Sequence, residues 1–331
     1  MKHKIFNEDI LKDEDMDGSV VRVKAFIINN NDEVIMASSN GGVQLIGGHV
    51  EDGESEVETL KREILEEAGI EVSNEEISKC FYEIRHYAKN YYNSGKNVLS
   101  IIHYYLVHTD KSPNLDKVHR TSQEKRYEFS LKQIPFNSLE DFLKGFLDNE
   151  KEVNRIIAAE TIEAFKNIPE LRDLYDINSN KTDKTYRKGD KVPEGYYPMV
   201  VMVVIRNSKG EFLMQKRVES KGGDWGVTGG HPKSGETPIE GIITEVKEEL
   251  GLDFSNEKFI EYDSGCDGKD CYKMYFVTKD IDINDIKIQK EELTEVRWFT
   301  MDELKSMVDS GELNEDQIAC FNKVCDYLNK K

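Results

Sequence analysis

The chain has 331 residues, of which 38% are hydrophobic, and a formal net charge of −19. This length suits two domains better than one, and the apolar content is sufficient for packed cores, which excludes a disordered chain. Because the acidic charge is spread over both halves without a dense basic stripe, we expect no duplex nucleic acid among the partners.

The sequence contains no segment that predicts membrane insertion or secretion. Its longest apolar run, MVVMVVI at 199–205, has the length of a strand and is too short to span a bilayer. The first residues, MKHKIFNEDI, lack the apolar core of a signal peptide. The five cysteines do not have zinc-knuckle spacing. We therefore expect free thiols in a reducing compartment, a cytoplasmic location and no membrane partner.

The first regular elements are predicted between residues 20 and 68. The segment VVRVKAFIINNNDEVIMAS, at 20–38, is typical of a hairpin of two β-branched strands around a polar turn. A helix is expected after Ser55, which forms a capping-box pattern with Glu58. Four apolar residues at helical spacing indicate its buried face: Val57, Leu60, Ile64 and Ala68.

An acidic face lies beside the apolar face of this helix. At about 100° per residue, Glu63, Glu66 and Glu67 fall close together, and like charges at that spacing destabilise an isolated helix. Folding does not require this arrangement, whereas Mg²⁺ prefers oxygen ligands of this kind. Arg62, four residues before Glu66, is placed to pair with that carboxylate and orient it. The pattern therefore indicates a divalent-cation site.

A long helical segment closes the first half of the chain. It is expected to begin with a cap at Ser138 and to end at Pro169. The boundary between two domains is predicted near 167–172. Residues 173–197 are then expected to form short strands and turns.

The acidic helix occurs a second time, 182 residues later (230 − 48 = 182), after a second hairpin pattern at 199–217. Thr237 is its predicted cap, with Pro238 and Glu240 in the first turn. The residues predicted for the apolar face are Ile239, Ile242, Val246 and Leu250, and those for the acidic face are Glu245, Glu248 and Glu249. A period of this length is too long for a solenoid and indicates two copies of one domain, 1–168 and 169–331.

Residues 48–70 resemble the signature box of the Nudix hydrolases. They match its order of Gly, five residues, Glu, seven residues, Arg-Glu, an apolar residue, any residue, Glu-Glu, any residue, Gly and an apolar residue. Residues 230–252 match it except at one position. The resemblance implies two tandem α/β/α sandwiches, each around a mixed β-sheet. It also implies hydrolysis of a diphosphate linkage in a nucleoside diphosphate linked to another group, with Mg²⁺ or Mn²⁺ and a nucleotide-type small-molecule substrate.

The resemblance implies roles for individual residues. Glu63, with Arg62 as its orienting partner, and Glu245 are implied as catalytic residues. The implied metal ligands are Glu63, Glu66, Glu67, Glu245, Glu248 and Glu249. The residues implied to shape the loop and the helix end are Gly48, Glu54, Gly69, Gly230, Glu236 and Gly251.

The second copy departs from the box at Thr244, which stands where the first copy has Arg62. A hydroxyl cannot replace the charge of a guanidinium, so we expect a less preorganised second site that still binds metal. Lys216 and Arg217, at the end of a predicted strand, are candidates for phosphate contacts. Trp225 is a candidate for base stacking, with a place in the core or at the rim as the alternative.

Other candidates are less specific. The late carboxylates that could contact metal, against the alternative of an exposed surface position, are Glu124, Glu128, Glu291, Glu292 and Glu295. Two histidines, His49 and His231, share the loop sequence GGH and are candidates for substrate or metal contacts, against a role in the loop itself.

Two other functions are compatible with parts of the sequence. The second copy also resembles isopentenyl diphosphate isomerases and the isomerase-like hydrolase branch, but Gly229 stands where the isomerase has a cysteine. One copy, above all the one with Thr244, could instead sense a nucleotide and regulate the other. Tyr87 has the spacing of the dinucleoside-polyphosphate branch. The substrate, and pairing as a homodimer or an internal pseudo-dimer, are left open.

Overall fold

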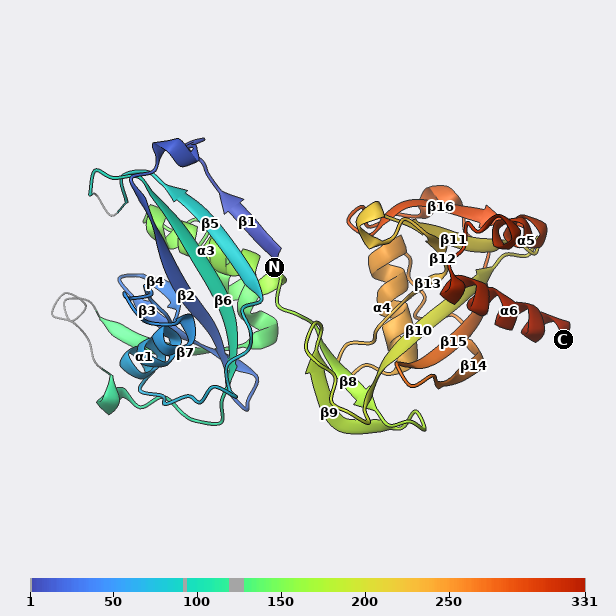
Figure 1. The fold of residues 1–331 in the computed structure, drawn as a ribbon, viewed down its shortest axis with the longest axis horizontal. Helices are drawn as coiled ribbons and strands as arrows, with labels where there is room; N and C mark the ends of the chain where they lie inside the picture. The colour runs from blue at the N-terminus through green and yellow to red at the C-terminus, as the bar shows by residue number, and fades with distance from the viewer. Residues whose placement is uncertain (1, 92–93, 119–127, 331) are drawn as a thin grey trace. The chain divides into compact units, whose positions relative to one another are not determined.

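Two mixed β-sheets, one in each half of the chain, organise the computed structural model (Figure 1). The structure describes residues 2–91, 94–118 and 128–330. Met1–Ile168 and Pro169–Lys331 form two compact units, and each unit is described by itself. Within the described ranges, no helix has the length and apolar character needed to cross a membrane.

The sheet of the first unit has the strand order β1-β5-β6-β2-β3-β4, and β7 pairs with β3. Its centre is the parallel pair β2–β6, which stays in register from Gly18 opposite Val98 to Ile28 opposite His108. The elements of this unit are β1 (Lys2–Phe6), β2 (Gly18–Ile28), β3 (Glu33–Ser39), β4 (Gly42–Leu45), α1 (Glu56–Ala68), β5 (Tyr82–Ala88), β6 (Val98–His108), β7 (Phe129–Pro135), α2 (Leu139–Lys144) and α3 (Glu152–Lys166).

Helices cover both faces of this sheet (Figure 1). Side chains alternate between the faces along a strand, so β2 contributes to two cores. Val23 packs with Leu60 of α1 on one face. Phe26 belongs to the core on the other face, which includes Ala164 of α3. The first unit is therefore an α/β/α sandwich, with α1 packed on one face of β2. The loop after β4 returns to β2, where Ile46 pairs with Ala25 and His49 with Arg22.

The second unit repeats this plan. Its sheet has the order β12-β11-β10-β15-β14, with β8 and β13 also paired to β10, β16 to β11 and β9 to β8. The central pair β10–β15 is again parallel. The elements are β8 (Leu171–Tyr175), β9 (Lys181–Arg187), β10 (Tyr197–Arg206), β11 (Phe212–Arg217), β12 (Trp225–Gly226), β13 (Thr228–Gly230), α4 (Pro238–Leu250), β14 (Ile260–Cys266), β15 (Cys271–Thr278), β16 (Leu293–Phe299), α5 (Met301–Ser310) and α6 (Glu315–Asn329).

The helices of the second unit also lie on opposite faces of its sheet. Ile242 and Val246 of α4 pack with Val201. Leu304 of α5 and Val324 of α6 belong to the core on the other face. The prediction of two α/β/α sandwiches around mixed sheets is confirmed.

The single helix expected from Ser138 to Pro169 is wrong, because the structure has two helices there. α2 ends at Lys144 and α3 begins at Glu152. Asn149 stabilises the turn between them: its Oδ1 accepts from the Lys151 backbone N at 3.0 Å, and its carbonyl oxygen accepts from Arg155 Nη1 at 2.7 Å. The predicted cap at Ser138 is also wrong, since its side chain makes no capping bond.

Two smaller expectations also differ from the structure. Ile239 is 40% exposed, because it lies in the first turn of α4, one turn before the buried Ile242. Cys266 and Cys271 lie opposite each other across β14 and β15 and are joined by a disulfide, so free thiols were the wrong expectation for this pair. Cys320 and Cys325 are free.

Candidate metal-dependent active sites

Both acidic helices begin and end with the residues that the sequence predicts. Ser55 Oγ accepts from the Glu58 backbone N at 3.3 Å, and Glu58 Oε2 accepts from the Ser55 backbone N at 2.8 Å. Thr237 and Glu240 form the same reciprocal pair at the start of α4. Each helix ends at a glycine in the left-handed conformation, Gly69 with φ of 67° in the first unit. These caps fix where each helix begins relative to the loop before it.

The loop before each helix brings a glycine against a glutamate. A side chain at Gly48 would place its Cβ 2.0 Å from Glu63 Oε1. A side chain at Gly230 would place its Cβ 2.1 Å from Glu245 Oε1. Because both positions are glycine, each carboxylate can lie directly on the loop backbone. The two glutamates predicted to be catalytic therefore occupy equivalent positions in the two units.

Arg62 organises the carboxylates of the first unit. Its Nε and Nη2 donate to the two oxygens of Glu54, each at 2.9 Å. Its Nη1 donates to Glu63 Oε1 at 2.8 Å and more weakly to Glu66 Oε2 at 3.4 Å. The bidentate bonds from Arg62 hold the pKa of Glu54 at about 2. Arg62 therefore joins the loop glutamate to the helix glutamates, and Glu66, its predicted partner, is the weakest of these contacts.

The second unit has a different set of contacts at the same place. Thr244 Oγ1 donates to Glu236 Oε1 at 2.8 Å, and so replaces the link between Arg62 and Glu54 with one neutral donor. The Nζ of Lys233 lies 2.6 Å from Glu248 Oε1. Lys233 stands at the loop position where the first copy has Glu51 (233 − 182 = 51). The cation beside the helix carboxylates thus comes from the loop in the second unit.

Glu249 of the second unit is buried and Glu245 is partly buried, and neither forms an ion pair among the described residues. Burial raises the pKa of Glu245 to about 7, and the charges of Glu249 and Glu248 add to this effect. Burial likewise raises the pKa of Glu249 to about 7. Gln215 Nε2 donates to Glu249 Oε2 at 2.8 Å, and Thr228 Oγ1 donates to Gln215 Oε1 at 2.8 Å. This chain of hydrogen bonds fixes the Glu249 carboxylate.

A cleft of about 660 Å³ opens beside these glutamates in the second unit. Arg217 and Trp225, two of the predicted substrate-binding residues, line it, whereas Lys216 does not. Trp225 also packs edge-on against Phe299, at 4.9 Å between ring centres, so it lies between core and cleft. Of the late carboxylates, Glu292 lines the cleft. Glu291, Glu295 and Glu128 are exposed, and Glu124 lies outside the described residues.

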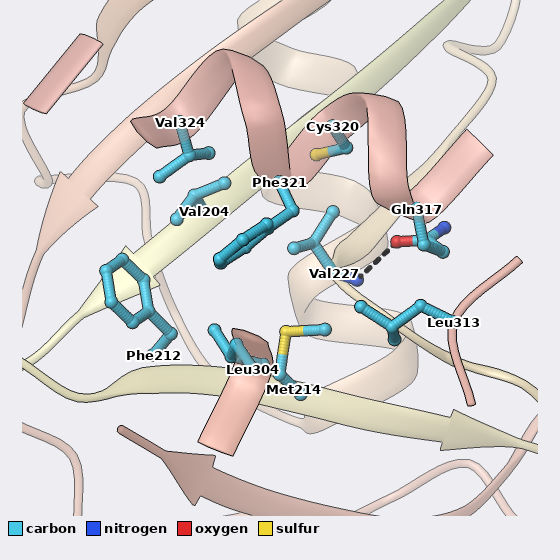
Figure 2. A pocket seen from close by; sticks show the side chains of 10 residues that line it. All are labelled: Val204, Phe212, Met214, Val227, Leu304, Leu313, Gln317, Cys320, Phe321 and Val324. Atoms are coloured by element: carbon cyan, nitrogen blue, oxygen red, sulfur yellow. Dashed lines mark hydrogen bonds between the residues drawn. The ribbon is translucent and has the colours of Figure 1, made fainter. Parts of the chain in front are cut away.

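The far wall of this cleft is α6. Figure 2 shows a small apolar cavity between α6 and the sheet, lined mainly by core side chains. Its volume of about 20 Å³ has room for little more than one water molecule, so it is a packing defect and not a substrate site. Gln317 lines both spaces, and its Oε1 accepts from the Val227 backbone N at 3.3 Å (Figure 2). That bond attaches α6 to the residue between β12 and β13, below the cleft.

A hairpin at the start of the second unit supports the loop before α4. Ser234 Oγ donates to Asp173 Oδ1 at 2.8 Å, and the Gly235 backbone N donates to Asp173 Oδ2 at 2.9 Å. The Ser234 backbone N also donates to the Leu171 carbonyl oxygen at 2.8 Å. β8 therefore anchors this loop by hydrogen bonds. Within the loop itself, Gly230 lies against Glu245, and Glu236 accepts from Thr244.

Comparison with known proteins agrees with this geometry. A family profile described as the NUDIX domain matches residues 18–149 and 196–318. The chain belongs to the Nudix family. It is 38% identical over 149 residues to the uncharacterized Nudix hydrolase lin0387 of Listeria innocua, which covers 42% of this chain and 85% of the relative. The uncharacterized Nudix hydrolase lmo0368 of Listeria monocytogenes is 36% identical over the same shares. The solved structure of DR0079 from Deinococcus radiodurans is similar at 21% identity, with a TM-score of 0.41, over 46% of this chain and 98% of that one.

The donor set of each Nudix box is suited to a hard divalent cation. All of its acidic side chains offer carboxylate oxygens, and in the second unit the pKa values of Glu245 and Glu249 show that negative charges crowd together in a buried place. In the described part of the chain, no three acidic, histidine or cysteine side chains already converge at metal-binding distance. Glu66 and Glu248 instead contact Arg62 and Lys233. Binding a cation would therefore require these two carboxylates to turn.

The two loop histidines have different surroundings. His231 lines the cleft, and burial lowers its pKa to about 4, with the charges of Arg172 and Lys188 adding to the effect. His49 Nε2 lies 3.0 Å from Tyr91 Oη. Both side chains are therefore near the Nudix box, and neither contacts one of its acidic side chains in the described residues.

Sequence reasoning missed two residues at these sites. Lys233 was not identified because its partner Glu248 is fifteen positions away (248 − 233 = 15), across a turn whose path the sequence does not give. The change from Glu51 to Lys233 between the copies was the available signal. Gln215, which precedes Lys216 and Arg217 in the sequence, was not predicted to contribute to the site. Its buried bond to Glu249 crosses from β11 to α4 and depends on tertiary structure. Tyr87, the substrate-branch candidate, donates to Asp13 Oδ1 at 2.6 Å.

Proposed function

We propose that each unit hydrolyses a diphosphate linkage in a nucleoside diphosphate linked to another group, and that hydrolysis requires Mg²⁺ or Mn²⁺. The observation that carries this proposal is the repeated contact of a loop glycine with a helix glutamate, Gly48 with Glu63 and Gly230 with Glu245. Neither glutamate is needed there for packing, and both lie beside two further carboxylates of the same helix.

The side chains of each unit would divide the work between them. The metal would be held by Glu63, Glu66 and Glu67 in the first unit and by Glu245, Glu248 and Glu249 in the second. When bound, it supplies charge neutralisation of the phosphates and lowers the pKa of water. Glu63 and Glu245 are placed to accept the proton of the attacking water. Arg62 orients Glu63, and Gln215 orients Glu249.

The cleft of the second unit suits the other end of such a substrate. Arg217 offers a guanidinium for a phosphate, and Trp225 offers an aromatic face at the same wall. These two roles are proposals that follow from position in the cleft. Lys216 has no role here because it does not line the cleft.

The test is product release by the full chain with one site inactivated at a time. Glu66→Gln with Glu67→Gln leaves the second site intact, and Glu248→Gln with Glu249→Gln leaves the first. Nucleotide sugars, dinucleoside polyphosphates, dinucleotide cofactors and nucleoside triphosphates are assayed with Mg²⁺ and with chelator. We expect metal-dependent cleavage of at least one class by each variant. Cleavage that persists unchanged in a chain with all four substitutions would contradict the assignment.

A second function, regulation by a non-hydrolysing second unit, is favoured by Thr244 in place of Arg62. The contact between Lys233 and Glu248 weighs against it, because a cation is still present at the carboxylates. Turnover by the chain whose first site is inactivated separates the two functions. Isomerase activity is disfavoured further by the structure: a Cβ at Gly229 would lie 2.5 Å from the Val201 carbonyl oxygen, so a cysteine does not fit there without a shift.

A further inference from the structure

The strand that faces the loop of the box differs between the two units. In the first unit, antiparallel pairing places Arg22 of β2 opposite His49. In the second unit, Val201 of β10 lies opposite Gly230, one residue before the loop histidine. Because the paired segments run in opposite directions, the residue that faces this histidine is Val200. Arg22 therefore has Val200 as its counterpart.

The same register makes Lys24 the counterpart of Met202. Val200 and Met202 line the cleft of the second unit, so the floor of that cleft is apolar. The equivalent positions in the first unit carry two cationic side chains, Arg22 and Lys24, two residues apart on the same face of β2.

In the described residues neither Arg22 nor Lys24 forms an ion pair with a carboxylate, although Glu63, Glu67 and Glu160 lie close enough for their charges to act on Lys24. Lys24 is 8% exposed, and its Nζ donates only to the carbonyl oxygens of Leu45 at 2.8 Å and Gly47 at 3.1 Å among the described residues. Arg22 Nε is buried and has no hydrogen-bond partner in the same part of the chain. Burial lowers the pKa of Lys24 to about 8, and the charge of Arg22 adds to this effect.

A buried hydroxyl lies beside them without a partner. Ser100 of β6 is 3% exposed, and its Oγ makes no hydrogen bond to the described residues. It lies opposite Val20 on the neighbouring strand, two residues from Arg22 and on the same face of the sheet. A buried ammonium, a partly buried guanidinium with an unpaired Nε and an unpaired hydroxyl are unfavourable together in the free protein. An anion that arrives with a ligand would satisfy all three groups.

We propose that Arg22, Lys24 and Ser100 form a phosphate subsite in the first unit. This unit then takes substrates that carry a phosphate in addition to the scissile diphosphate, whereas the second unit has Val200 and Met202 at these positions and lacks this subsite. The division of substrates rests on the proposed function. The subsite itself does not, because it binds an anion whether or not hydrolysis follows.

The test uses inorganic pyrophosphate without any divalent metal, measured by calorimetric titration of the full chain. In the absence of metal the carboxylates of both boxes repel phosphate. The cations of the second cleft, Arg217 among them, are the same in every variant, so a difference in binding between variants reports the cationic subsite of the first unit. The double variant Arg22→Val with Lys24→Met installs the residues of the second unit. We expect its affinity for pyrophosphate to be lower than that of the natural chain by about tenfold or more. The matched control is Arg85→Val with Lys89→Met, which removes the same charges from exposed positions.

Each outcome decides the proposal. Weaker binding by the double variant and unchanged binding by the control support it. Equal binding by the natural chain and the double variant overturns it, as does an equal loss in the control. If the double variant fails to fold, Arg22→Gln keeps the Lys24 contacts and is expected to weaken binding alone. A chain that binds pyrophosphate through Arg22 but hydrolyses no nucleotide would contradict the proposed function and leave the subsite standing.

Discussion

The two loop–helix junctions hold the same carboxylates with differently placed cations. In the first unit the cation is Arg62 on the helix, which contacts the loop glutamate and two helix glutamates at once. In the second unit the helix has a threonine, and Lys233 of the loop reaches Glu248. The difference shows that the position of a charge can move between neighbouring elements while the acidic set stays constant.

The two cations are not equivalent in strength. Arg62 has a side chain only 25% exposed and makes bidentate bonds, whereas Lys233 is 42% exposed and makes one contact. A partly buried, bidentate guanidinium fixes its partners more firmly than an exposed ammonium does. Glu245 therefore lies free of an ion pair in the described structure, while Glu63 is bonded to Arg62. We expect the first site to be the more preorganised of the two.

The largest effect is expected from removing a carboxylate charge at either site. Glu66→Gln or Glu67→Gln, and likewise Glu248→Gln or Glu249→Gln, should each lower metal-dependent turnover of its own unit by about a hundredfold or more. Turnover of the other unit should not change. Thermal unfolding without metal should stay constant or move to higher temperature, because a repulsion is removed. Near-normal turnover at saturating Mg²⁺ would mean that the substituted residue is not a ligand.

The next effect concerns the arginine of the first site. Arg62→Thr should weaken Mn²⁺ binding there by about tenfold or more, because Glu54, Glu63 and Glu66 lose their shared donor. The reciprocal Thr244→Arg should strengthen binding at the second site by less, since Lys233 already contacts Glu248. Titration followed by electron paramagnetic resonance, with the other site inactivated, measures both. Equal affinities before and after both changes would show that this arginine does not organise the metal site.

A smaller effect is expected from the lysine of the second site. Lys233→Ala should change Mn²⁺ affinity of that site by only about threefold, because the pair is exposed to solvent. Lys233→Arg should restore the natural affinity. The control is Lys247→Ala, which removes an exposed cation from α4 itself. If Lys247→Ala has the larger effect, the helix and not the loop supplies the relevant charge.

The smallest effect is a difference in acid stability between the two loop histidines. His231 is held neutral by burial with a pKa of about 4, below the usual 6.5. The unfolded chain therefore binds more protons between pH 6.5 and pH 4, and stability falls as the pH falls through that range, by at most about 3 kcal/mol. His231→Asn should reduce this loss in thermal unfolding at pH 7.5 and pH 5. His49→Asn should reduce it less, because the lowering of the His49 pKa is smaller. Equal effects would contradict the comparison.

The sequence predicted the parts of the sites that are local along the chain. The capping boxes at Ser55 and Thr237 depend on residues three positions apart, so the pattern specifies them directly. The α/β/α layers were implied by the resemblance to the Nudix box, and the presence of two copies by the repeat. The break between α2 and α3 was missed because it depends on bonds made by Asn149 to backbone and side chains, which helix periodicity does not show. Ile239 was assigned to the core because periodicity gives the direction of a side chain but not the extent of the surface that covers it.

The different position of the cation in the two units could be predicted from the sequence only in part. Thr244 could be recognised as a departure because it lies inside a fixed pattern. Lys233 lies at a variable position of that pattern, and its meaning depends on how the loop folds back over α4. The cationic floor at Arg22 and Lys24 was hidden for a similar reason, since strand register decides which residue of β2 faces the loop.

The hairpin of β8 and β9 has a consequence for where the second folding unit begins. Residues 169–195 lie outside the segment that the family profile matches. Even so, Asp173 accepts hydrogen bonds from Ser234 and Gly235, and β8 pairs with β10. A fragment cut at residue 196 would keep the recognisable domain but lose the acceptor for the loop and uncover the backbone of β10. Such a fragment would expose a strand edge to other chains. Aggregation of a trimmed domain would then result from the lost pairing of β8 with β10, and not from an unstable core.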